Sequence, residues 1–273
     1  MGSVPIPAKQ VLALRASLQG ARYEIIACVT LLIWDWALLL SEEVKLIHKK
    51  RWTWFKCLYI CCRYYPFISF GITIHFWVLD HSPLYCEQFL VGHSMSMIPL
   101  QFFPHSVLLF RCWVFAGKKK GLLLALCTFL ASMLCLQIWG TTTGPGLLDD
   151  QFTPTGQFGC FRDTLDDSTR RLTGYVMLAG VLIDIIAVIV IVRHYYKHHR
   201  DRPHGSLGLL FMQQALGCFG VIFFLTILAG AFHASGNVQL DGKGFVTVLT
   251  LPNILACRLY VFFPFGLSDI IRP

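Results

Sequence analysis

Residues 24–40 of the chain read EIIACVTLLIWDWALLL, a continuous apolar stretch that contains one acidic residue, Asp35, after its opening glutamate. A helix needs roughly 20 mostly apolar residues to cross about 30 Å of hydrocarbon, so this stretch lies at the short end of what can span a bilayer. It lacks the alternation of polar and apolar residues that is typical of a strand in an outer-membrane barrel. The stretch therefore predicts a transmembrane helix.

Six more segments along the chain meet the same test of length and apolar content. Together with the first, they occupy Glu24–Leu40, Phe55–Leu79, Phe89–Phe115, Gly121–Trp139, Leu172–Val192, Leu207–His233 and Phe245–Phe265. We therefore expect an all-α fold, an integral membrane bundle of seven transmembrane helices. The bundle forms a single domain over residues 24–265, with an N-terminal segment at residues 1–23 and a short C-terminal tail at residues 266–273.

The composition of the whole chain indicates the same class. Of its 273 residues, 55% are hydrophobic and 14% are charged, whereas soluble domains carry about 25% charged residues. A soluble fold of this size cannot bury so much apolar surface, because surface area limits what one core can cover. The composition excludes a disordered chain and a nucleic-acid-binding protein. The lipid bilayer is the expected partner, and no nucleic acid is.

Lysine and arginine are distributed unequally between the connecting loops. The loops after the first, third and fifth segments carry twelve of them, whereas the opposite loops and the N-terminal segment carry seven. Because positive charge is retained in the cytoplasm, the N-terminus is predicted outside and the C-terminus inside. This orientation implies the secretory pathway, in the plasma membrane or the endoplasmic reticulum. The basic runs Lys118–Lys120 and Arg193–His204 are expected to contact anionic lipid headgroups on the cytoplasmic face.

Nine of the 11 cysteines fall within or at the ends of apolar segments, where a free thiol behaves as a small apolar residue. Cys61 and Cys62 are interpreted in this way, as packing residues rather than acylation sites. Cys86 and Cys160 lie in loops on the predicted outer face, which is oxidising in the secretory pathway. We expect these two to form a disulfide that ties the long loop between the fourth and fifth helices over the bundle.

Four ionisable residues fall inside apolar segments, where a charge costs about 2.5–3.5 kcal/mol to insert. They are Asp35, Arg63, Asp184 and Arg258. Their positions place them roughly 8–12 Å inside the cytoplasmic boundary. We expect Asp35 to pair with Arg63, and Arg258 to pair with Asp184, or with Asp35 if the first and seventh helices are neighbours. We favour a layer that fixes bundle packing over a switch or a coupling site for protons or ions.

The sequence has no nucleophile elbow, phosphate-binding loop, dinucleotide fingerprint or zinc-ligand spacing. We therefore assign no catalytic residue, no metal ligand and no cofactor. His75, His93 and His105 lie in apolar segments and are interpreted as hydrogen-bonded core histidines.

Four prolines fall inside predicted helices: Pro66, Pro99, Pro104 and Pro252. Each removes a backbone donor and kinks the helix axis. The sequence does not decide whether such kinks open a cavity or improve packing.

The stretch Tyr23–Phe67, YEIIACVTLLIWDWALLLSEEVKLIHKKRWTWFKCLYICCRYYPF, resembles the N-terminal domain of unknown function of multi-pass membrane proteins from mushroom-forming basidiomycete fungi. The residues that carry the resemblance are Tyr23, Asp35, Glu43-Val44, Lys50-Arg51-Trp52, Arg63-Tyr64-Tyr65-Pro66, Arg111, Gly159-Cys160 and Ala256-Cys257-Arg258. The resemblance implies a seven-helix fungal protein without an established activity. It also singles out Asp35 and Arg63.

Two classes of function fit these expectations. The predicted topology and disulfide are similar to those of G-protein-coupled receptors, so a receptor-like protein of unknown ligand is the first hypothesis. The chain departs from the commonest receptor class, because residues 108–115, LLFRCWVF, lack Asp-Arg-Tyr and Pro252-Asn253 stands without the usual Asn-Pro-x-x-Tyr. The second hypothesis is an intramembrane enzyme for a lipid or terpenoid, with Asp35 or Asp184 as general acid. A transporter or scaffold is the third.

Overall fold

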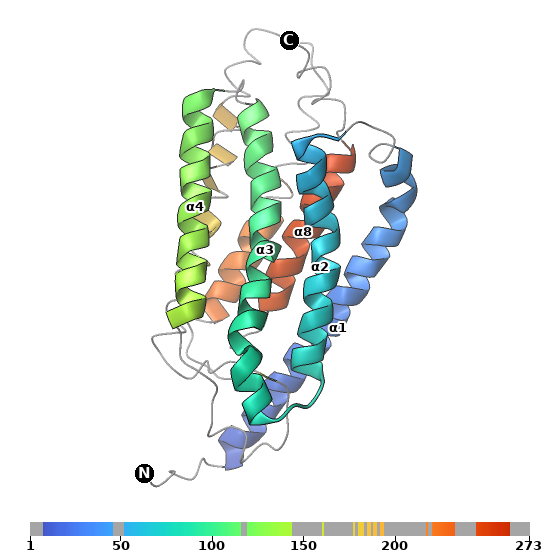
Figure 1. Ribbon diagram of the computed structural model, residues 1–273, viewed down its shortest axis with the longest axis vertical. Helices are drawn as coiled ribbons and strands as arrows, with labels where there is room; N and C mark the ends of the chain where they lie inside the picture. Colours follow the sequence, from blue (N-terminus) through green and yellow to red (C-terminus); the bar gives the residue numbers. More distant parts are fainter. Residues whose placement is uncertain are drawn as a thin grey trace.

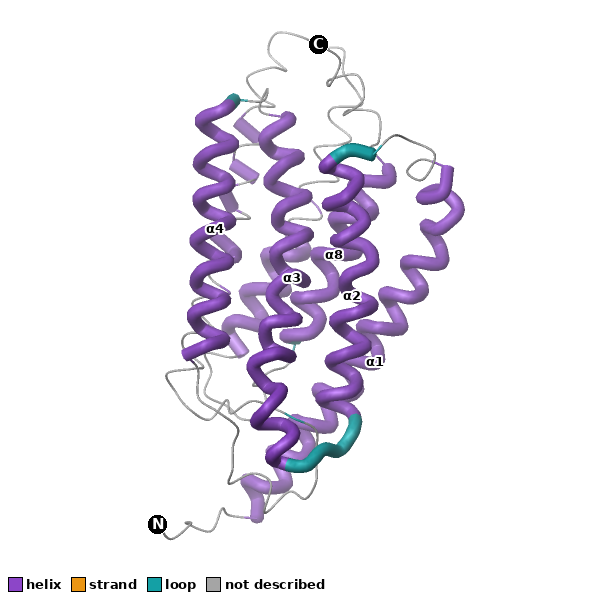
Figure 2. The backbone as a smooth tube through the Cα atoms, viewed as in Figure 1, coloured by secondary structure: helices purple, strands orange, loops and turns teal. Residues whose placement is uncertain are grey.

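The computed structural model describes residues 8–45, 52–115, 119–143, 160, 177, 180–182, 185–186, 188–189, 192–193, 217, 220–232 and 244–262. Its long helices are α1 (Ala8–Glu43), α2 (Trp54–Val78), α3 (Pro83–Phe115), α4 (Lys120–Thr143) and α8 (Phe245–Phe262). They run side by side along one long axis (Figure 1). Within the described residues the regular structure is entirely helical (Figure 2), which confirms the all-α prediction for this part of the chain.

Three helices contain stretches that are long and apolar enough to cross a membrane: Leu18–Glu43, Lys56–Val78 and Lys120–Thr142. These stretches identify a membrane protein by helix length and composition. Two shorter apolar helices cover Gly220–Phe232 and Phe245–Tyr260, the latter within α8. The seven spans, their orientation and the single domain stay predictions, because most of the expected fifth segment, 172–192, lies outside the described residues.

The helices are longer than the apolar segments that predicted them. α1 begins at Ala8, well before the predicted start at Glu24, and continues past Leu40 to Glu43. α3 begins at Pro83 rather than at Phe89, and proline suits the first turn of a helix because its missing N–H is not needed there. Apolar content marks where a helix enters hydrocarbon, whereas the helix itself continues through polar residues that favour it.

One side of α1 faces the bundle. Its buried residues recur every three or four positions: Ile25, Cys28, Leu32, Asp35, Leu39 and Glu43. The other side exposes large apolar residues: Tyr23, Ile26, Ile33, Trp34 and Leu38. Water-soluble proteins rarely expose a contiguous apolar surface of this kind. α1 therefore packs on α2 and α8 with one side and offers the other side to lipid.

α8 packs against α1, α2 and α3, and a residue of α1 caps its first turn. The Glu24 carboxylate accepts hydrogen bonds from the backbone N–H groups of Gly244 (3.1 Å) and Thr247 (3.0 Å), and from the Thr247 hydroxyl (2.8 Å). The first N–H groups of a helix lack partners within it, and a negative charge there also complements the helix dipole. Gly244 adopts φ +79°, a conformation that glycine reaches without steric cost. Glu24 thus fixes the start of α8 against α1.

A proline in α3 creates a hydrogen-bond acceptor for α8. Pro104 has no N–H, so the carbonyl of Leu100, four residues earlier, loses its helical donor. The Asn253 amide donates to that carbonyl at 2.7 Å and to the Leu249 carbonyl at 2.7 Å, and the Asn253 side chain is 2% exposed. At this proline, the freed carbonyl serves helix packing.

Replacing Asn253 with alanine should destabilise the protein by about 1–3 kcal/mol, because the buried Leu100 carbonyl then lacks a donor. In a Pro104→Ala background the same change should cost less, since alanine at position 104 supplies the missing N–H. A double-mutant cycle on thermal unfolding in detergent measures the difference. Thr128→Ala, which removes an exposed hydroxyl of α4, is the control and should have little effect. An equal cost of Asn253→Ala in both backgrounds would contradict the assignment.

Candidate functional site

A single carboxylate joins three helices inside the bundle. Asp35 of α1 is 1% exposed. Its Oδ2 accepts a hydrogen bond from Arg63 Nη1 of α2 at 2.6 Å, and its Oδ1 accepts one from Arg258 Nε of α8 at 2.6 Å. Both oxygens are therefore engaged by guanidinium groups, which are the donors best suited to carboxylates.

Arg63 extends this network toward the end of α1. Its Nη2 donates to the main-chain carbonyls of Asp35 (3.3 Å) and Trp36 (3.1 Å). Its Nε lies 3.4 Å from Oε2 of Glu43, a fully buried residue. The other oxygen of Glu43 accepts a hydrogen bond from the Tyr64 hydroxyl at 2.9 Å. We call Asp35, Glu43, Arg63, Tyr64 and Arg258 the charged network.

The charged network balances two carboxylates against two guanidinium groups. Such balance matters in hydrocarbon, where an isolated charge is costly and a paired one is tolerated. Asp35 lies about 12 Å along the axis before the last residue of α1, and Arg63 lies about 13 Å along the axis after the first residue of α2. The two side chains therefore meet at one level of an antiparallel helix pair.

The structure brings together three of the four predicted residues: Asp35, Arg63 and Arg258. Arg258 contacts Asp35, which is the arrangement expected for neighbouring first and last helices. Asp184 lies outside the described residues. Sequence reasoning named Glu43 only among the residues that carry the family resemblance. It did not place Glu43 in the ion-pair layer, because the first helix was predicted to end at Leu40. The signal that could have identified Glu43 is its position on the buried side of α1, four residues after Leu39 in a pattern that recurs every three or four residues.

One of the two arginines of the charged network is exposed. The Arg63 side chain is 3% exposed, whereas the Arg258 side chain is 44% exposed. An ion pair with one solvated partner is weaker than a buried one. In the described residues, no group of three or more His, Cys, Asp or Glu side chains is arranged to hold a metal ion. The network therefore consists of ion pairs that join α1 to α2 and α8, with one partner accessible from outside the bundle.

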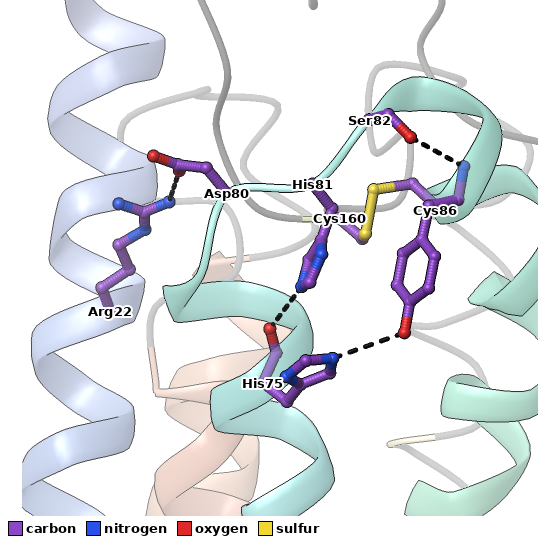
Figure 3. Close-up of a disulfide and its surroundings, with 8 residues drawn as sticks. Arg22, His75, Asp80, His81, Ser82, Cys86 and Cys160 are labelled. Atoms are coloured by element: carbon purple, nitrogen blue, oxygen red, sulfur yellow. Dashed lines mark hydrogen bonds and ion pairs between the residues drawn. A yellow bond between two sulfur atoms is a disulfide. The ribbon is translucent and has the colours of Figure 1, made fainter.

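The opposite end of the bundle is held by different contacts (Figure 3). Cys86, near the start of α3, and Cys160 form a disulfide with their Cα atoms 5.1 Å apart, and the Cys160 N–H donates to the Phe76 carbonyl at 2.8 Å. Both cysteines pack in one apolar cluster with Phe76. Oxidation of this pair in the cell stays a prediction.

Polar contacts surround the disulfide. Arg22 of α1 donates to the Trp77 carbonyl at 3.0 Å and to Asp80 at 3.0 Å. His81 lies 2.7 Å from the His75 carbonyl through its Nε2. His75 is exposed, so its interpretation as a core histidine was wrong. His93 is buried and lies 3.4 Å from the Thr73 hydroxyl, as a core histidine should.

One comparison with known proteins gives a match. A model described as a family of unknown function (DUF6533) matches residues 23–68. These bounds nearly coincide with the resemblance at Tyr23–Phe67 and confirm its domain of unknown function. The matched segment contains four members of the charged network, Asp35, Glu43, Arg63 and Tyr64. No curated protein matches the chain, and no solved structure does.

Replacing Asp35 with asparagine should destabilise the bundle strongly, by about 3–5 kcal/mol, because two guanidinium groups lose their shared counter-charge. Arg258→Ala should cost less, since that side chain is half-exposed. The measurement is the thermal unfolding midpoint together with the monodisperse fraction in detergent. Glu42→Gln is the matched control: it removes an exposed carboxylate of α1 that pairs with Lys45 at 3.2 Å, and exposed pairs contribute about 0–1 kcal/mol. An Asp35→Asn protein as stable as this control would contradict the role given to the network.

The disulfide predicts a thiol count. The denatured wild-type protein, alkylated without reductant and weighed by mass spectrometry, should gain two further alkyl groups after reduction. In the Cys86→Ser protein, Cys160 should be a free thiol that is alkylated before reduction. Reduction should therefore add no further alkyl group from this pair. Cys257→Ser, which removes a free thiol, should keep the two-group difference. If the wild-type protein carried the same number of alkyl groups with and without reduction, the pair would not be oxidised.

Proposed function

We propose that this chain is a receptor-like seven-helix membrane protein, with its N-terminus outside and its C-terminus in the cytoplasm. Its signal would arise from opening of the charged network. The observation that carries the proposal is the contrast between the two ends of the bundle. A disulfide and an aromatic cluster hold one end. Ion pairs, one of them made by the half-exposed Arg258, hold the other end.

The direction of the helices supports the proposed topology. Glu24 and Asp35 of α1 contact Thr247 and Arg258 of α8 in that order, so α1 and α8 run in the same direction. If both helices span the bilayer, the number of spans from the first to the last is odd. Seven spans satisfy this condition and place the two termini on opposite sides.

The charges support the orientation. The network end of α1 is followed by Lys45 and by the basic run Lys49-Lys50-Arg51, and α4 begins at that end with Lys120. Positive charge is retained in the cytoplasm and attracts anionic lipid headgroups. The disulfide then faces the outside of the plasma membrane or the lumen of the endoplasmic reticulum, where disulfides persist.

An intramembrane enzyme is the weaker proposal. It requires a carboxyl group that is available to transfer a proton to a substrate. Both oxygens of Asp35 are engaged by Arg63 and Arg258, so Asp35 serves helix packing better than acid catalysis.

The test is signalling in cells that carry a heterotrimeric G-protein reporter. Because opening of the network is the proposed active state, Arg258→Ala should raise basal reporter output, while Glu42→Gln should leave it at the wild-type level. A ligand panel applied from outside should stimulate the wild type. Unchanged basal output in Arg258→Ala, with no response to any ligand and with tagged protein present at the cell surface, would refute a receptor coupled to G proteins.

A further inference from the structure

Three cysteines of α2 occupy different environments near the start of the helix. Cys62 is buried and its sulfur lies 3.5 Å from Oδ1 of Asn253. Cys61 is half-buried, and Cys57 is exposed. Cys57 and Cys61 are four positions apart, so they lie on the same face of α2, one turn from each other. The structure thus separates one packing thiol from two that reach the surface.

The exposed thiol lies at the level of the membrane interface. Cys57 follows the first residue of α2 by less than one turn, about 4.5 Å along the axis. The neighbouring Trp52 and Trp54 side chains are 74% and 88% exposed, and the Lys56 amine lies 4.5 Å from the centroid of the Trp52 ring. Exposed tryptophans with nearby basic groups are typical of the boundary between headgroups and hydrocarbon.

Below the two thiols and the half-buried Tyr64, the same face of α2 carries exposed apolar residues. Ile68 is 62% exposed and Ile72 is 36% exposed. Cys57 and Ile72 are about four turns apart, or about 22 Å along the axis, which is close to the length of an extended long-chain acyl group. A chain attached at Cys57 can therefore lie along α2 with its whole length in hydrocarbon.

We propose that Cys57 is a site of S-acylation by a long-chain fatty acid. Cys61 is the second acceptor, in place of the packing role expected from the sequence, because it is half-buried whereas Cys62 is buried. The Cys57 thiolate attacks the thioester carbonyl of a fatty acyl-coenzyme A, directly or through an acyltransferase. A new sulfur–carbonyl bond forms, the bond to the coenzyme A sulfur breaks, and coenzyme A leaves with the proton. No oxidant or reductant is needed. The site requires the start of α2 to face the cytoplasm, where acyl-coenzyme A is present, and juxtamembrane cysteines are the usual acceptors.

Another exposed cysteine provides a matched control. Cys135 of α4 is exposed, but it lies well inside the helix, which begins at Lys120. Its position is about 22 Å along the axis from that start, about twice the depth of Cys61 in α2. A thioester donor with a polar coenzyme A group does not reach that depth, so exposure without interface position should not lead to acylation.

The test is acyl exchange on the full chain expressed in eukaryotic cells. Free thiols are blocked, thioesters are cleaved with hydroxylamine, and the released thiols are coupled to a polyethylene glycol maleimide that shifts the protein on a gel. The wild type should show a hydroxylamine-dependent shift. Cys57→Ser should lose most of it, Cys57→Ser/Cys61→Ser should lose all of it, and Cys135→Ser should keep it.

Two results would overturn the proposal. One is the absence of a hydroxylamine-dependent shift in the wild type, and the other is an unchanged shift in the Cys57→Ser/Cys61→Ser protein. Because Cys57 is exposed at the end of a helix, its replacement by serine should not impair folding, and equal amounts of tagged protein in the membrane fraction verify this.

Discussion

Hydrocarbon offers no water to a polar group, so a buried charge or a carbonyl freed by proline is stabilised when another helix supplies its partner. Asp35 shows the consequence most clearly, because its two oxygens are engaged by arginines of two different helices. The Leu100 carbonyl, which Pro104 deprives of its helical donor, finds the Asn253 amide of α8. The first N–H groups of α8 find Glu24 of α1. These contacts decide which helices are neighbours, a choice that apolar side chains alone leave open.

The polar contacts also fix the register between helices. On α1, Glu24 and Asp35 are separated by the same number of positions as their partners on α8, Thr247 and Arg258. Between α1 and α2, the separation of Arg22 from Asp35 matches that of their partners, Trp77 and Arg63, to within one position. Because all α-helices rise by the same amount per residue, equal separations allow both contacts between a pair of helices to form in a single register. α1 is therefore joined to α2 and to α8 at two levels, one at Arg22 and Glu24 and the other at Asp35.

The sequence predicts the helical class and the meeting of Asp35 with Arg63, because a short connection makes consecutive helices neighbours and two opposite charges at one depth attract. It leaves the partner of Arg258 open, since no local pattern states which distant helices touch. Glu43 was not placed in the ion-pair layer because apolar content, which ends where hydrocarbon ends, was used to place the end of α1. The bond between Asn253 and Leu100 joins residues 153 positions apart. Pro104 marks the free carbonyl in the sequence, but only the packing of α8 on α3 identifies its donor.

The doubly joined helices limit how this protein can change shape. α1, α2 and α8 share a core of buried apolar residues with the middle of α3, whereas the second half of α3 packs in another core with α4, the helix over Gly220–Phe232 and Leu259 of α8. A third core joins Val107 of α3, just after Pro104, to α2 and α8; its other buried members are Tyr59, Cys62, Ala256 and Cys257. Packed cores move as units rather than deforming continuously. Because the third core continues past Pro104, α3 is held to α2 and α8 on both sides of the proline. A change that separated α3 from α8 would have to open this core as well as the contact between Asn253 and Leu100.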